Sequence, residues 1–134
     1  MQEKNYEFKK KWFEYLGYKP HNGQIPLHYP KNYDARFQVV VCGRRFGKTW
    51  ASAMEATYVA SQPNKRIWVV GMSYKKARLI FREIWQRMVV GHMEDVDKAS
   101  EKDMYIRFKW GTIVEGMSAD NPSSLVGEGL DLLV

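Results

Sequence analysis

The residues best suited to chemistry lie close together in the run VVVCGRRFGKTWA, from Val39 to Ala51. Its centre holds three cations, Arg44, Arg45 and Lys48, and a threonine hydroxyl directly after the lysine. Its two glycines allow a tight turn in which backbone N–H groups point inward at an anion. This combination of groups suits phosphate together with Mg²⁺, so the spacing predicts a phosphate-binding loop.

A strand before the loop and a helix after it would have to position these groups. Three β-branched residues in a row predict a short buried strand over Phe37 to Cys42. Good helix formers from Ala51 to Ala60 predict a helix that runs to about Ser61, with the positive end of its dipole at the loop. Strand, glycine turn, Gly-Lys-Thr and helix together are the pattern of the P-loop in nucleotide triphosphatases.

In such a loop Lys48 reaches the β- and γ-phosphates, and the Thr49 hydroxyl ligates Mg²⁺. One position departs from the pattern, because the first glycine is expected at Cys42 and occurs instead at Gly43. The alternative is a strand, turn and helix with a Gly-Lys-Thr that occurs by chance. The strand, the helix and the two loop arginines together favour a nucleotide site.

Composition narrows the possible classes of protein. The chain has 134 residues, 45% of them hydrophobic, which suits one domain or part of one. A net charge of +6 suggests an anionic partner, most commonly nucleic acid, although a basic domain without such a partner is the alternative. The single cysteine excludes an internal disulfide and a cysteine-rich zinc site. We expect no signal peptide and no membrane span, and therefore a cytoplasmic protein.

Periodicity and turn residues predict the remaining elements. They are a helix over Glu3 to Leu16, a loop over Gly17 to Asp34, a strand over Arg66 to Met72, a helix capped by Ser73, a loop over Gly91 to Asp103, a hairpin of Met104 to Phe108 with Thr112 to Gly116, a loop over Met117 to Gly129 and a strand from Leu130. Alternating helices and strands predict an α/β fold, with a mostly parallel sheet and helices on both faces. The phosphate loop would lie at the carboxyl end of the first strand, where such sheets bind ligands.

Two further features leave alternatives open. Gln24 lies in a turn upstream of the loop, and its amide could match the N6 amino group and N7 of adenine, or could simply be solvated. The helix after Ser73 carries an apolar stripe and a basic face, which is either a solvated surface or a DNA-facing one. His21 and His28 have no carboxylate or cysteine at ligand spacing, so we expect no metal site there.

Four runs, PHNGQ, ARFQVVVCGRRFGKT, RIWVVGMSYKKARLIF and SLVGEGLDLLV, resemble the large terminase subunit of tailed bacteriophages, specifically its N-terminal ATPase domain. The resemblance covers roughly Tyr18 to Val134. It implies a RecA-like P-loop fold, with an N-terminal helix over 1–17 and part of the P-loop core over 18–134. It also implies an ATPase that uses ATP and Mg²⁺ to drive viral double-stranded DNA into procapsids. The implied partners are the portal protein, the small terminase subunit and further copies in a ring, in the host cytoplasm and without a membrane.

The resemblance also assigns roles to individual residues. Gln24 matches the glutamine used against adenine, Lys48 the catalytic lysine and Thr49 the Mg²⁺ ligand. Arg44 matches a catalytic arginine that faces the γ-phosphate from the same subunit; the alternative is a surface arginine that steers an anion. The implied nucleotide-binding set is Gln24, Gly43, Arg44, Arg45, Phe46, Gly47, Lys48, Thr49 and Trp50.

The chain departs from the family pattern at its end. The Walker B aspartate and the glutamate that activates water are not present, and Asp131 lies at the start of its strand, roughly 10 Å from the position needed. No nuclease domain is present either. We therefore expect a piece of a larger protein, inactive as an ATPase when made alone. The alternatives are another nucleic-acid-dependent P-loop enzyme, such as a superfamily 2 helicase, or a nucleotide- or DNA-binding module without hydrolysis.

Overall fold

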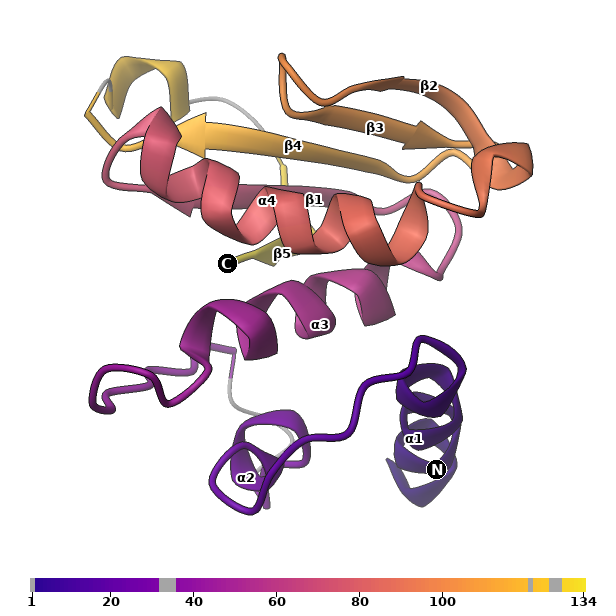
Figure 1. Cartoon of the computed structure of the whole chain (residues 1–134), viewed down its shortest axis with the longest axis vertical. Coiled ribbons are helices and arrows are strands. Elements are labelled where there is room, and N and C mark those ends of the chain that lie inside the picture. The colour runs from indigo at the N-terminus through magenta and orange to yellow at the C-terminus, as the bar shows by residue number, and fades with distance from the viewer. Residues whose placement is uncertain (1, 32–35, 121, 126–128) are drawn as a thin grey trace.

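A computed structural model describes residues 2–31, 36–120, 122–125 and 129–134 (Figure 1). Asp34 of the predicted first loop, Asn121, and residues 126–128, which include the first two residues of the Gly-Glu-Gly run, lie outside the described residues. The elements are α1 (Gln2–Tyr15), α2 (Ile25–His28), α3 (Lys48–Ala60), β1 (Arg66–Gly71), α4 (Tyr74–Met88), η1 (Met93–Asp95), β2 (Val96–Ser100), β3 (Tyr105–Phe108), β4 (Ile113–Ser118), η2 (Pro122–Leu125) and β5 (Leu132–Leu133).

The strands form one mixed sheet in the order β2-β3-β4-β1-β5. β1 pairs in parallel with β4 on one side and with β5 on the other, in a register that places Ile67 beside Val114 and Leu132. The predicted hairpin is confirmed, because β3 and β4 are antiparallel, and β2 extends the sheet beyond β3 in the same manner. The predicted α/β fold class is confirmed.

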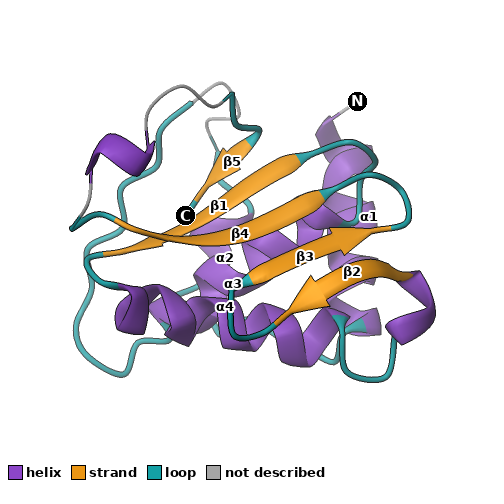
Figure 2. Cartoon of the chain, turned by 90° about the horizontal axis from the view of Figure 1, so that it is seen from above, coloured by secondary structure: helices purple, strands orange, loops and turns teal. Residues whose placement is uncertain are grey.

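Two helices form the layer against the sheet. α4 packs on β1 and β4, and α3 packs on α4 and β1. In Figure 2 the helices lie behind the sheet, so those described helices that contact it cover one face, whereas the sequence predicted helices on both. The predicted apolar stripe of α4 is confirmed, because Ala77, Phe81 and Ile84 are fully buried. Its predicted cap is also confirmed, because Ser73 Oγ accepts a hydrogen bond from the N–H of Lys76 at 3.3 Å.

The predicted strand over Phe37 to Cys42 is wrong. These residues form no strand, and Val39 and Val41 are 86% and 91% exposed. β-branched residues favour an extended backbone, but a strand also needs a hydrogen-bonded neighbour. Within the described part of the chain no strand lies beside this segment, and β5 ends the sheet on the side of β1. Exposed β-branched residues therefore mark a segment without pairing partners.

Two of the predicted loops contain short elements. α2 lies within the predicted loop from Gly17 and contains Pro26, which is tolerated in a first helical turn. β2 lies within the predicted loop from Gly91. Its polar sequence VDKAS does not favour a strand, and pairing with β3 stabilises it. The final strand from Leu130 is confirmed as β5. Among the described helices, none has the length and apolar character needed to cross a bilayer.

Candidate functional site

The N-terminus of α3 is open toward solvent. Its N-cap is Gly47, which has a left-handed backbone with φ of 95° and no side chain to accept a hydrogen bond. The first backbone bond of the helix runs from the N–H of Ala51 to the carbonyl of Gly47 at 2.9 Å. Among the described residues, no side chain caps the N–H groups that precede Ala51. An uncapped N-terminus combines free donors with the positive end of the helix dipole, which is a favourable place for phosphate.

Lys48 lies directly at this helix end. Its Nζ donates to the carbonyl of Cys42 at 2.7 Å and is 3.4 Å from the carbonyl of Gly43, so the ammonium group lies over the loop. Both contacts are exposed, and a phosphate oxygen would give the ammonium group a stronger, charge-assisted bond. Thr49 follows on the exposed side of the same turn. These groups fit a bound triphosphate with Mg²⁺.

The loop backbone also has the curvature expected of an anion site. Arg45 has φ of 61°, and Gly47 has φ of 95°. A left-handed conformation costs a residue with a side chain about 1–2 kcal/mol, so the loop contains a strained position at Arg45. Gly43 has no positive φ, and a Cβ placed on it would meet no atom within 4 Å. The shape of the loop therefore does not require a glycine at position 43, which is one place later than the P-loop pattern expects.

Gln24 and His21 hold the loop from outside. Gln24 is 4% exposed, and its Nε2 donates to the carbonyl of Gly47 at 3.1 Å. His21 Nε2 lies 2.7 Å from the carbonyl of Phe46. The predicted place of Gln24 in a turn is confirmed, but its amide is bound by the protein at both ends, because Oε1 accepts from the N–H of His21 at 3.0 Å. One N–H and one lone pair of this amide remain for another partner.

A cleft of about 430 Å³ extends from the loop. The indole ring of Trp50 stacks on Tyr18, with ring centres 6.2 Å apart and planes inclined by 25°. The guanidinium of Arg87 lies 5.1 Å from the centre of the same indole, and its Nη1 donates to the carbonyl of Leu16 at 2.8 Å. Gln24 and Arg45 also line this cleft. An aromatic face beside a buried amide suits a nucleotide base.

A buried polar network lies behind Tyr18. The fully buried His28 lies 2.8 Å from the Tyr18 hydroxyl through Nε2 and 2.6 Å from Glu55 Oε1 through Nδ1. Lys9 Nζ contacts the same Glu55 oxygen at 2.5 Å. Burial raises the pKa of the Tyr18 phenol well above its ordinary value, and the nearby Glu55 charge adds to the rise. The phenol therefore stays protonated and donates to His28.

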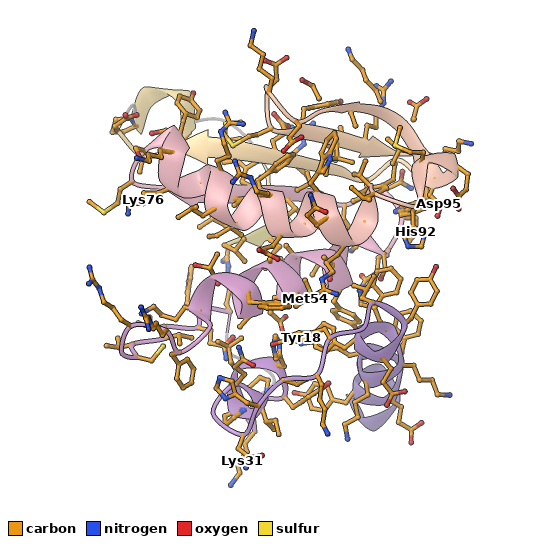
Figure 3. The ribbon with its side chains drawn as sticks, viewed as in Figure 1. Tyr18, Lys31, Met54, Lys76, His92 and Asp95 are labelled. Atoms are coloured by element: carbon orange, nitrogen blue, oxygen red, sulfur yellow. The ribbon has the colours of Figure 1, made fainter. Side chains whose placement is uncertain are left out.

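This network joins the N-terminal segment to α3. Lys9 belongs to α1, His28 to α2 and Glu55 to α3. Figure 3 shows Tyr18 between α3 and the N-terminal segment. Each polar group of this network has a partner within it, so the ion pair of Lys9 and Glu55 is not left uncompensated. The segment that carries His21 and Gln24 is thereby fixed on the helix that follows the loop.

The structure brings most of the predicted nucleotide-binding residues together. Gln24, Arg45, Phe46, Gly47 and Trp50 line the cleft, and Lys48, Thr49 and Gly43 lie at the adjoining helix end and loop. Arg44 is exposed and does not line the cleft, so its predicted catalytic role stays a prediction.

Asp131 is engaged elsewhere. Its Oδ2 accepts from the N–H of Arg66 at 2.9 Å, at the start of β5. Asp131 thus lies at the start of its strand as predicted, and its exclusion as a metal-binding carboxylate stays a prediction.

Sequence reasoning missed three residues of this site. Tyr18 and His21 belong to the predicted loop over Gly17 to Asp34, and Arg87 belongs to a helix face interpreted as solvated or as DNA-facing. Arg87 stands four residues after Glu83, a spacing typical of a helical ion pair, but its guanidinium contacts Leu16 and Trp50 instead. The one sequence feature that could have indicated His21 as a site residue is its position, three residues before Gln24 and next to a glycine-containing turn.

Comparisons with known proteins agree with the family resemblance of the sequence. No protein-family model matches the chain. Two curated relatives, each named terminase, large subunit, come from Thermus virus P23-45 and Thermus phage G20c. Each is 28% identical over 145 residues, which cover 92% of this chain and 29% of the relative. The chain thus spans less than a third of the length of these relatives.

The structural neighbours lead to the same family. The large terminase ATPase domain of Thermus phage P74-26 superposes with a TM-score of 0.76 and 26% identity, over 92% of this chain and 55% of that chain. A single-substitution variant of that domain superposes with a TM-score of 0.77. The fold is thus that of a P-loop ATPase domain. Over nearly all of its length, the chain is similar to the ATPase domain of phage terminase large subunits.

Proposed function

We propose that the chain forms the ATP-binding part of a DNA-packaging ATPase. The observation that carries the proposal is the open N-terminus of α3, with Lys48 folded over a loop that turns through Arg45 and Gly47. Free N–H groups, a helix dipole and an ammonium group converge there, and phosphoryl transfer is catalysed mainly by such positioned charge. The similarity to terminase ATPase domains supports the same activity.

Three side chains would act on the phosphates. Lys48 would exchange its carbonyl partners for β- and γ-phosphate oxygens. The Thr49 hydroxyl would ligate Mg²⁺, which neutralises the phosphate charge when bound. Arg44 would turn toward the γ-phosphate and stabilise the charge that develops in the transition state, because a guanidinium presents donors to several oxygens at once. Its exposed position leaves room for that movement.

The cleft beside the loop would hold the base and ribose of ATP. Trp50 is 42% exposed, so part of its indole ring is open to a ligand, and Tyr18 and Arg87 hold that ring in place. Gln24 would use its remaining N–H and lone pair to read the adenine edge. The hydrogen bond to the carbonyl of Gly47 fixes the Gln24 amide in one orientation, which a selective contact requires.

In the whole protein, hydrolysis would drive double-stranded DNA into a procapsid. Portal protein, small terminase subunit and further copies in a ring would be the partners, in the host cytoplasm. The net charge of +6 supports a polyanionic partner. A superfamily 2 helicase would share the glutamine and the loop, but the matched relatives are terminases. Nucleotide binding without hydrolysis would instead indicate a binding module.

Base selection offers a direct test in the full-length protein. We expect ATP to bind more tightly than GTP, and Gln24→Ala to narrow the ratio of the two Kd values by about two- to tenfold, since one neutral hydrogen bond is lost. Gln86→Ala, which removes an exposed amide from α4, is the matched control and should leave the ratio unchanged. Titration with both nucleotides, and phosphate release with and without DNA, measure the outcome. An unchanged ratio in Gln24→Ala would remove the adenine role.

A further inference from the structure

Both ring nitrogens of His21 are hydrogen-bonded, one to the phosphate loop and the other within the turn of His21 itself. Nε2 lies 2.7 Å from the carbonyl of Phe46, and Nδ1 lies 3.1 Å from the N–H of Gly23. A carbonyl only accepts and an N–H only donates, so Nε2 carries the proton and Nδ1 accepts. The ring also meets the Phe46 ring edge to face, with centres 5.0 Å apart. These contacts leave the imidazole a single orientation.

His21 and Gln24 bind the carbonyls of Phe46 and Gly47, and these two bonds determine where the following N–H groups of the loop point. In a trans peptide the C=O of one residue and the N–H of the next are coplanar and point in opposite directions. A hydrogen bond to the carbonyl of Phe46 therefore directs the N–H of Gly47 away from His21. The bond from Gln24 to the carbonyl of Gly47 likewise directs the N–H of Lys48 away from Gln24. These two N–H groups lie at the open end of α3.

The glycines at this contact fit the same arrangement. A Cβ on Gly23 would lie 2.6 Å from the Phe46 ring, and one on Gly47 would lie 2.5 Å from Gln24 Nε2. Either side chain would separate the His21–Gln24 turn from the loop. The absence of a side chain at both positions thus leaves room for the Phe46 ring and the Gln24 amide where the turn meets the loop.

We propose that His21 is a positioning residue of the phosphate loop, which it holds through the carbonyl of Phe46 so that the N–H groups of Gly47 and Lys48 face the phosphates. The inference rests on the proposed function for the identity of the ligand. His21 touches no phosphate itself. Its effect is on the loop, so it acts equally on every nucleoside triphosphate, in contrast to the base-selective role of Gln24.

The experiment uses the full-length protein with His21→Ala, His21→Gln and, as matched control, His92→Ala at the opposite side of the molecule from the loop (Figure 3). Trypsin is added without nucleotide, and mass spectrometry follows cleavage after the exposed Arg44 and Arg45. His21→Ala should be cleaved about two- to tenfold faster, because loss of one hydrogen bond raises the population of the opened loop. The Kd values for ATP and GTP should rise together by a similar factor.

Glutamine at position 21 can place an N–H donor close to the position of Nε2, so His21→Gln should restore both the cleavage rate and the two Kd values toward those of the parent. His92→Ala should match the parent. An unchanged cleavage rate in His21→Ala, or failure of glutamine to restore it, would overturn the positioning role. A parent protein that binds no nucleotide would overturn the proposed function alone, because the cleavage rates decide the role of His21 without any ligand.

Discussion

Two parts of the molecule share one local pattern, an apolar run followed by a turn and a helix. In the first, residues 37–42 lead through the phosphate loop into α3; in the second, β1 leads through Gly71 to Ser73 into α4. β1 is paired on both sides, with Ile67 and Val69 fully buried. The first run pairs with none of the described strands and is largely exposed. The same sequence signal therefore gives a strand only where neighbouring strands complete its hydrogen bonds.

The two helix ends differ in a related way. α4 is capped by its own Ser73, and its turn is so close that a Cβ on Gly71 would lie 2.3 Å from the backbone nitrogen of Ala77. α3 begins at a glycine, without a side-chain cap and after a longer loop that contains a strained arginine. A helix end that satisfies its own N–H groups has little to offer a ligand. The open end retains its donors for one.

The largest effect is expected when a lysine is removed from the open end of α3 rather than from the capped end of α4. Lys48→Ala removes the ammonium group at the open end of α3, and we expect hydrolysis by the full-length protein to fall roughly 100-fold or more, as when one charge-stabilising donor is lost. Lys75→Ala removes an exposed lysine from the first turn of α4 and is the matched control, with activity close to that of the parent. Phosphate release measures both. Equal losses in the two variants would mean that the helix ends are not functionally different.

The sequence predicted these two units to different extents. Ser73 and the stripe of α4 were predictable, because a cap and a 3.6-residue period are local signals. The strand from Phe37 was not, because pairing depends on distant residues. At the site, the motif identified Lys48 and Thr49, while the contacts of His21 and Arg87 join segments 25 and 71 residues apart. No local pattern encodes such contacts, which arise only when the chain folds.

A second comparison concerns the two glycines that follow the apolar runs. Gly71→Ala would force a Cβ against the backbone of α4, and we expect the free energy of unfolding to fall by about 1–3 kcal/mol, as for other overpacked sites. Gly43→Ala meets no neighbour and should leave stability within about 0.5 kcal/mol of the parent. Urea denaturation of the two full-length variants measures the difference. A larger loss in Gly43→Ala would show that the loop is packed more closely than the turn of α4.

The smallest expected effect tests the cap itself. Ser73→Ala removes the oxygen that accepts from the N–H of Lys76, and we expect a loss of about 1 kcal/mol in the free energy of unfolding, whereas Ser73→Gly should cost only a few tenths of that. Both variants should keep the Kd for ATP of the parent, because the cap serves α4 and not the loop. Urea denaturation and nucleotide titration together check this. If Ser73→Ala left stability unchanged, water would satisfy the first N–H groups of α4 as well as a side chain does. The absence of a cap would then cost a helix no measurable stability. In that case only Lys48 and the shape of its loop, and not the missing cap, would indicate a phosphate site at the N-terminus of α3.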